Sequence, residues 1–142
     1  MVGVKRTKMT SKTGNVFVDS SVWIELFSNV QAASVVSSAL AGKTLATTSL
    51  VLAEIASYAA RTGTLPEVLR DIRVLADIVS IDEALGIRAG ELHGKLRRHR
   101  AKISLADCAL LAAAEYHKGV VITFDTDFRG LPGVKLLKKG KQ

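Results

Sequence analysis

Short runs of apolar, mostly β-branched residues alternate along this chain with longer segments that have helical periodicity. The short runs predict buried strands, and the longer segments predict helices that end near glycines. We expect strands at 15–18, 43–49, 77–81, 120–124 and 134–137. We expect helices at 22–27, 29–42, 50–63, 65–76, 82–101 and 104–119.

The order of these elements predicts the fold class. Strands that are apolar along their whole length and separated by helices are typical of a parallel sheet covered on both faces. We therefore predict a three-layer α/β/α sandwich around a parallel sheet of about four to five strands. In such folds ligands bind outside the carboxyl ends of the strands, so functional residues are expected there.

One predicted helix carries an unusual pattern of glycines. Gly86, Gly90 and Gly94 recur every four residues within 82–101, which places them on one face. Glycine in a helix interior costs about 1 kcal/mol relative to alanine. The spacing therefore predicts a face on which a neighbouring element packs closely.

The chain of 142 residues is long enough for one domain with a substantial core. Its net charge of +7 is concentrated at the two ends. We expect a basic, flexible N-terminal tail at 1–14, a single domain at 15–137 and a basic C-terminal tail at 138–142.

A third basic cluster lies inside the predicted domain. Its members are Lys95, Arg97, Arg98, Arg100 and Lys102. Such a cluster favours a polyanionic partner such as RNA, and a solvated helix face is the alternative interpretation.

The single cysteine, Cys108, excludes an intramolecular disulfide and fits a reducing, cytoplasmic compartment. The apolar runs are far shorter than the roughly 20 residues that span a membrane, and no secretory signal precedes them. We therefore expect a cytoplasmic protein with no membrane partner.

Five carboxylates follow strands or begin helices in this pattern. Asp19 ends the first predicted strand, Asp125 ends the strand at 120–124, and Asp127 lies two residues further. Glu54 and Asp107 lie near the starts of helices. Because these ends share one edge of a parallel sheet, the five side chains are expected to meet there.

Carboxylates gathered in apolar surroundings repel one another, and a divalent cation relieves that conflict. Oxygen ligands without paired histidines or cysteines favour Mg²⁺ or Mn²⁺ over zinc. Each acid also has a local alternative: a helix cap for Asp19, a capping box for Asp107, turn formation for Asp125 and Asp127, and an exposed helix position for Glu54.

Four segments in order carry a family resemblance: "VFVDSSVWIELF", "TTSLVLAEIAS", "ISLADCALLAAA" and "VITFDTDF". They resemble the motifs of PIN-domain ribonucleases, and the chain is most similar to the VapC-type toxins of toxin–antitoxin pairs. The resemblance implies Mg²⁺- or Mn²⁺-dependent cleavage of RNA, a homodimer and a possible protein antitoxin.

Residue roles follow from the same resemblance. It implies catalytic roles for Asp19, Glu54, Asp107 and Asp125, and metal binding by Asp19, Asp107, Asp125 and Asp127. Ser20 and Thr123 match hydroxyl positions that orient the acids or a bound water. The basic cluster at 95–102 would hold flanking phosphates of the RNA.

Three other functions compete with the toxin interpretation. A PIN nuclease of RNA maturation or quality control would share the same acids, and a PIN-like module could bind RNA without cutting it. A phosphatase of the haloacid-dehalogenase type also begins with an aspartate after its first strand. That family needs a second aspartate two residues later, where this chain has Ser21.

Overall fold

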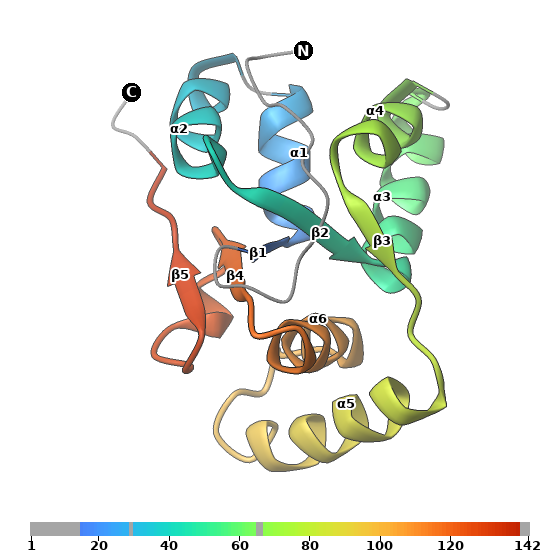
Figure 1. Cartoon of the computed structure of the whole chain (residues 1–142), viewed down its shortest axis with the longest axis vertical. Coiled ribbons are helices and arrows are strands. Elements are labelled where there is room, and N and C mark those ends of the chain that lie inside the picture. Colours follow the sequence, from blue (N-terminus) through green and yellow to red (C-terminus); the bar gives the residue numbers. More distant parts are fainter. Residues whose placement is uncertain (1–14, 29, 65–66, 140–142) are drawn as a thin grey trace.

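The computed structural model describes residues 15–28, 30–64 and 67–139 of the chain. They form a central sheet with helices on both faces (Figure 1). The predicted three-layer α/β/α sandwich is confirmed. The N-terminal tail expected at 1–14 lies outside the described residues, as do residues 140–142.

The sheet contains five parallel strands in the order β3-β2-β1-β4-β5. Their bounds are β1 (Asn15–Val18), β2 (Thr44–Thr48), β3 (Asp77–Val79), β4 (Val120–Thr123) and β5 (Val134–Leu136). Pairing of Val16 with both Leu45 and Val120 places β1 at the centre. The chain order reverses beside β1, which is where parallel sheets of this kind bind ligands.

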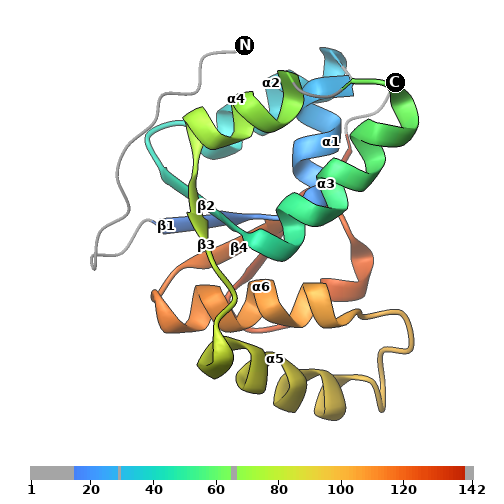
Figure 2. The same ribbon diagram turned by 90° about the vertical axis from the view of Figure 1, so that its right-hand side faces the viewer.

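In the described part of the chain, the helices form two groups that cover opposite faces of the sheet (Figure 2). The first group is α1 (Ser20–Ser28), α2 (Val30–Leu40), α3 (Ser49–Thr62) and α4 (Glu67–Leu75). The second group is α5 (Glu83–Leu96) and α6 (Leu105–Tyr116), followed after β4 by the 3-10 turn η1 (Thr126–Phe128). In the second group α6 lies against the sheet and α5 packs outside it.

The core forms between the central strands and these helices. Phe17 of β1, Trp23 of α1 and Phe128 of η1 are fully buried. Burial of apolar surface at about 25 cal/mol per Å² is the main force that holds the layers together. The strands read as continuous apolar runs because helices cover both of their faces.

The α5 glycines and the C-terminal residue Lys139 have surroundings that differ from the simplest expectation from the sequence. Gly86, Gly90 and Gly94 are exposed on α5, and a Cβ placed on any of them would meet no atom within 4 Å. The prediction of close packing on that face is therefore wrong, because α5 turns its other side toward α6. Lys139, in the predicted basic C-terminal tail, forms an ion pair of 2.9 Å with Glu25 on α1.

None of the helices in the described ranges has both the length and the apolar character needed to cross a membrane.

Candidate functional site

Asp19 is the residue that links β1 to α1 at the carboxyl edge of the sheet. Its backbone N–H donates to the Ile122 carbonyl (3.1 Å), which continues the pairing of β1 with β4. Its backbone carbonyl accepts the N–H groups of Val22 and Trp23, at 3.0 and 3.3 Å, and so begins α1. The residue is only 3% exposed, and its carboxylate accepts from side-chain hydroxyl groups such as that of Thr123. Because the first N–H groups of α1 donate to the Asp19 backbone carbonyl and not to its side chain, the helix-cap interpretation of this side chain is wrong.

Two hydroxyl groups hold the Asp19 carboxylate. Ser21 Oγ and Thr123 Oγ1 each donate to Asp19 Oδ2 at 2.8 Å. The same hydroxyls accept from the backbone, Ser21 from Phe124 N–H (3.1 Å) and Thr123 from Asp125 N–H (2.9 Å). Each hydroxyl thus accepts a backbone N–H and has its proton available for Asp19, and the two hydroxyl oxygens lie 3.3 Å apart.

The sequence predicted this orienting role for Ser20 and Thr123, whereas in the structure Ser21 and Thr123 have it. Thr123 does contact Asp19. Ser20 instead lies beside the Glu54 carboxyl group and acts to lower its pKa. Position alone could not separate the two serines, because they are consecutive in the first turn of α1 and point in different directions.

Glu54 lies in the second turn of α3, a helix that Thr48 caps by accepting the Val51 N–H at 3.1 Å. The residue as a whole is exposed, yet its carboxyl group lies beside Ser20. Burial of that group, and then the charges of Asp19 and Asp107, raise the pKa of Glu54 from 4.5 to about 7. The Ser20 hydrogen bond opposes this shift.

Asp107 lies in the first turn of α6 and closes a capping box with Ser104. Asp107 Oδ2 accepts from Ser104 N–H at 2.9 Å, and Ser104 Oγ accepts from Asp107 N–H at 3.0 Å. Burial is the main cause that raises the pKa of the Asp107 carboxyl, and the charges of Asp19 and Asp125 add to it. The backbone hydrogen bond from Ser104 acts in the opposite direction. The capping interpretation is thus confirmed, and the same side chain faces the other acids.

Asp125 and Asp127 form the turn that follows β4. Asp125 Oδ1 accepts from Asp127 N–H at 2.8 Å and so caps η1. Asp125 is near enough to Asp107 to raise its pKa. Asp127 joins this arrangement through its backbone N–H, and the turn-forming interpretation of both residues is confirmed.

The structure therefore brings Asp19, Glu54, Asp107 and Asp125 together at the carboxyl edge of the sheet, from four different elements. In the described part of the chain, no three His, Cys, Asp or Glu side chains lie close enough to form a ready metal cage. The donor chemistry nevertheless fits a hard cation, because all four donors are carboxylates that disfavour one another's charge. Mg²⁺ needs only one or two protein carboxylates when water and phosphate oxygens complete its shell.

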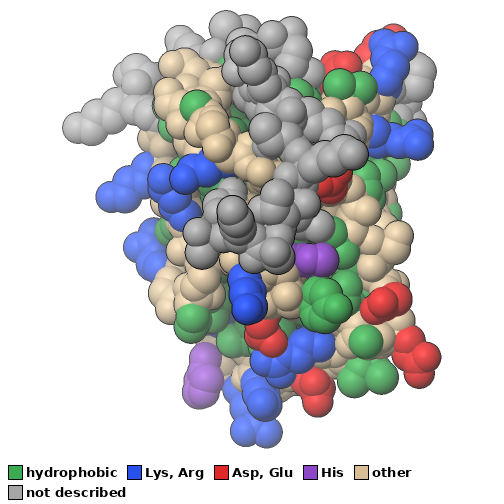
Figure 3. Space-filling model, in the orientation of Figure 1, with side chains coloured by type: hydrophobic (Ala, Val, Ile, Leu, Met, Phe, Trp, Pro, Cys, Tyr) green, Lys and Arg blue, Asp and Glu red, His purple; other side chains and the backbone are tan. Residues whose placement is uncertain are grey.

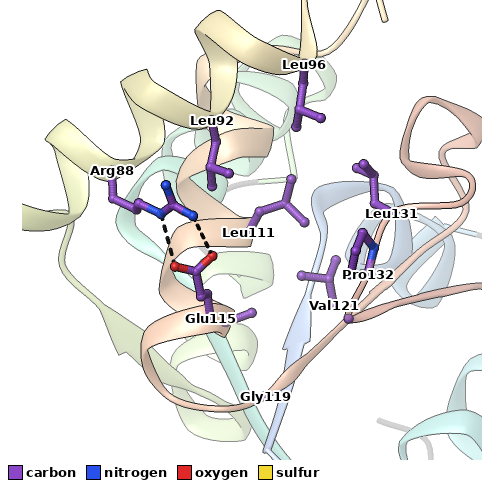
Figure 4. Close-up of a pocket in the computed structure, with 11 residues that line it drawn as sticks. Arg88, Leu92, Leu96, Leu111, Glu115, Gly119, Val121, Leu131 and Pro132 are labelled. Atoms are coloured by element: carbon purple, nitrogen blue, oxygen red, sulfur yellow. Dashed lines mark hydrogen bonds and ion pairs between the residues drawn. The ribbon is translucent and has the colours of Figure 1, made fainter. Parts of the chain in front are cut away.

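The four acids do not line the apolar cavity that the described residues form beside α5. That cavity, of about 430 Å³, lies between α5, α6 and the segment before β5 (Figure 4). Its walls include Leu92, Leu111 and Leu131, and a bidentate pair of Arg88 with Glu115 at 3.0 and 3.1 Å lies at its margin. Half-buried apolar walls beside a satisfied ion pair offer no group for hydrolytic chemistry, so the acidic edge is the candidate site.

A family model of the PIN domain matches residues 16–134. The chain belongs to the PIN-domain family. The match covers β1 to β4 almost completely, reaches the first residue of β5 and includes each of the four clustered acids.

Solved structures with the same fold include several toxin–antitoxin proteins. A toxin–antitoxin complex from Klebsiella pneumoniae aligns with a TM-score of 0.72 and 25% identity, covering 84% of this chain and 95% of that one. VapBC2 from Rickettsia felis, bound to a promoter DNA fragment, aligns with a TM-score of 0.68 and 16% identity, covering 87% of this chain and 97% of that one. VapC20 from Mycobacterium tuberculosis, a sarcin-ricin loop cleaving toxin, aligns with a TM-score of 0.65 and 20% identity, covering 84% of this chain and 96% of that one. No curated protein sequence matches the chain.

The basic cluster of this PIN domain lies at the end of α5 and in the connection to α6. Lys95, Arg97, Arg98 and Lys102 are exposed, whereas Arg100 is half-buried. Figure 3 shows basic side chains gathered at the lower end of the molecule, over α5, with acidic side chains beside them. Since α6 starts at the acidic edge, the connection that precedes it brings these cations to the same end of the PIN domain.

The raised pKa of Glu54 predicts a pH-dependent stability effect in the metal-free PIN domain. Its folded-state pKa of about 7 exceeds the ordinary 4.5, so folding favours the protonated form. Glu54 therefore stabilises the fold most below pH 4.5, and that contribution is lost as the pH rises through 7. We expect Glu54→Gln to unfold at a higher temperature than wild type at pH 8 in EDTA, with a smaller difference at pH 4. Thermal unfolding by circular dichroism measures this, and an equal difference at both pH values would contradict it.

Proposed function

We propose that this PIN domain is a metal-dependent endoribonuclease that hydrolyses RNA phosphodiester bonds and acts as the toxin of a VapBC-type toxin–antitoxin system. The observation that carries the proposal is the cluster of four carboxylates at one sheet edge, in a PIN fold, where burial and then the charges of neighbouring acids raise the pKa of Glu54 and Asp107. Such mutual destabilisation of charge is typical of functional sites.

We assign the cofactor as Mg²⁺ or Mn²⁺, held by Asp19, Asp107 and Asp125 with Asp127 beside them. When bound, a divalent ion of this kind neutralises charge on the phosphodiester and makes a water molecule more acidic. The side chains of the chain supply the rest. Ser21 and Thr123 hold Asp19 in place, and Glu54, which lies beside Asp19 and Asp107, accepts the proton of the attacking water.

The partners that we propose are an RNA substrate, a second copy of the chain and a protein antitoxin. The toxin–antitoxin complexes among the solved structures support the antitoxin, since they share the fold over most of both chains. The single buried cysteine is compatible with action in the cytoplasm. Light scattering tests the dimer, and a mass near 15.2 kDa at working concentration would contradict it.

The decisive experiment is cleavage of labelled RNAs by the purified protein with Mg²⁺, Mn²⁺ or EDTA. We expect cutting with either metal, none in EDTA, and loss in the Asp107→Asn variant. Tight RNA binding without cutting under any metal would overturn the nuclease and indicate a binding module. Cutting that leaves bacterial growth unaffected on expression would favour a nuclease of RNA maturation or quality control over a toxin.

The exposed part of the basic cluster predicts how binding depends on salt. We expect the double variant Arg97→Ala, Arg98→Ala to bind single-stranded RNA more weakly, with a similar reduction for different sequences. The slope of log affinity against log salt should become shallower by about 0.7 for each phosphate that the protein no longer neutralises. Fluorescence anisotropy across a salt series measures this. Arg70→Ala on α4, on the opposite face of the sheet, is the control, and an unchanged slope in the double variant would contradict the assignment.

A further inference from the structure

Arg100 differs from the other members of the basic cluster in where its guanidinium group lies. The side chain is half-buried, and Nη1 donates to the backbone carbonyl of Asp127 at 3.0 Å. Its neighbours Arg97 and Arg98 are exposed. A planar guanidinium holds a fixed direction once it is bonded, which suits Arg100 for joining two pieces of backbone.

On one side of this contact, Arg100 is fixed to the segment that leads into α6. The backbone N–H of Arg100 donates to the Leu96 carbonyl at 2.9 Å, and the backbone carbonyl of Arg100 accepts from Ile103 N–H at 3.2 Å. Ile103 is fully buried, and Ser104 after it caps α6. The position of Arg100 is thus tied to the start of the helix that carries Asp107.

On the other side, the acceptor belongs to η1, which Asp125 caps. The turn is closed by Phe128 N–H on the Asp125 carbonyl (3.1 Å) and by Arg129 N–H on the Thr126 carbonyl (3.0 Å). Gly130 follows in a left-handed conformation (φ +78°), and a Cβ there would lie 3.8 Å from Arg100 Nη2. The guanidinium group therefore lies over η1, the turn that Asp125 caps.

We propose that Arg100 is a positioning residue that joins the α5–α6 connection to η1 and thereby fixes the placement of Asp107 relative to Asp125. This inference rests on the proposed nuclease function and removes Arg100 from the set of phosphate-binding residues that the sequence suggested. The hydrogen bond to the Asp127 carbonyl and the partial burial of Arg100 direct its guanidinium group toward η1, whereas Arg97 and Arg98 beside it are exposed to solvent. The charge of Asp125 already reaches Asp107, so the separation of the two is sensitive to movement of either segment.

The two roles of an arginine are separable by kinetics. A residue that binds phosphate affects KM and the salt dependence, whereas a positioning residue affects kcat. We therefore compare Arg100→Ala and Arg100→Lys with Arg98→Ala, measuring kcat, KM and the salt slope on one labelled RNA. In parallel, hydrogen exchange of the Phe128 and Arg129 amides reports on η1 without any need for activity.

For Arg100→Ala we expect kcat to fall by about tenfold to a hundredfold, with little change in KM or salt slope. Lysine, which can still donate to the Asp127 carbonyl, should restore part of kcat. Exchange of the Phe128 and Arg129 amides should accelerate in Arg100→Ala and not in Arg98→Ala, which should instead raise KM.

A raised KM and shallower salt slope in Arg100→Ala, with kcat and amide exchange unchanged, would overturn the proposal and return Arg100 to RNA binding. If the wild-type protein cuts no RNA, the nuclease proposal fails by itself. The exchange measurement then still decides the Arg100 contact: unchanged exchange in Arg100→Ala overturns it, and faster exchange supports it.

Discussion

The Asp19→Asn variant is expected to fold normally and to lose RNA cleavage by a factor on the order of 10³ or more. Asparagine has the shape of aspartate and keeps one oxygen that accepts from Ser21 and Thr123, so the hydrogen bonds at this buried position survive. The negative charge is lost, and with it the carboxylate that would hold a divalent cation. Cleavage assays with Mg²⁺ and circular dichroism on the same sample measure the two expectations separately.

The loss of charge has a second expected consequence within the site. Asp19 raises the pKa of both Glu54 and Asp107, so removing its charge moves both pKa values back toward their ordinary range. Asp71→Asn on α4 makes the same chemical change at a residue outside the cluster of four acids and serves as the matched control. Wild-type cleavage rates in Asp19→Asn would remove this carboxylate from the catalytic site.

Among the glycines in the described ranges, Gly119 is the one at which substitution by alanine is expected to be most damaging. A Cβ at Gly119 would lie 2.8 Å from Phe17 Cδ1 and 2.9 Å from the Asn15 carbonyl oxygen. Phe17 is fully buried and stacks on His117 at 5.8 Å, and the Asn15 carbonyl belongs to the central strand. Since neither neighbour can yield without disturbing β1, we expect a destabilisation of about 2–3 kcal/mol. For a domain of this size that lowers Tm by roughly 6–12 °C, which differential scanning calorimetry measures.

Gly90→Ala is the matched control for this prediction, since it makes the same change on an open helix surface. A Cβ there meets nothing within 4 Å, so alanine should stabilise α5 by about 0.5–1 kcal/mol through its better helix propensity. A Gly119→Ala variant as stable as wild type would show that β1 and the loop before β4 have room that the structure does not indicate. We therefore expect the free energy of unfolding to decrease in Gly119→Ala and to increase in Gly90→Ala.

The features that the sequence could predict are those that depend on local pattern. Continuous apolar strands and amphipathic helices are visible in the order of residues, because burial on both faces of a sheet demands apolar side chains at every strand position. The parallel arrangement then placed Asp19 and Asp125 at one edge, since the carboxyl ends of parallel strands meet there. The capping box of Ser104 and Asp107 was equally readable, because its partners are three residues apart.

The features that the sequence could not predict depend on which way a side chain points and on contacts between distant segments. Ser21 rather than Ser20 binds Asp19, because the direction of each hydroxyl is set by the packing of α1 against β4. Gly119 rather than the α5 glycines meets a close neighbour, and that neighbour, Phe17, lies in a strand at the opposite end of the domain sequence.

The sequence by itself therefore determined the layers of this protein and the edge at which its acids gather, because both follow from local periodicity and strand direction. Only the tertiary structure decided which hydroxyls hold Asp19, and it also showed that Arg100 donates to the Asp127 backbone. Those choices depend on the packing of segments that lie far apart in the chain, and residue order alone does not encode that packing in any local pattern.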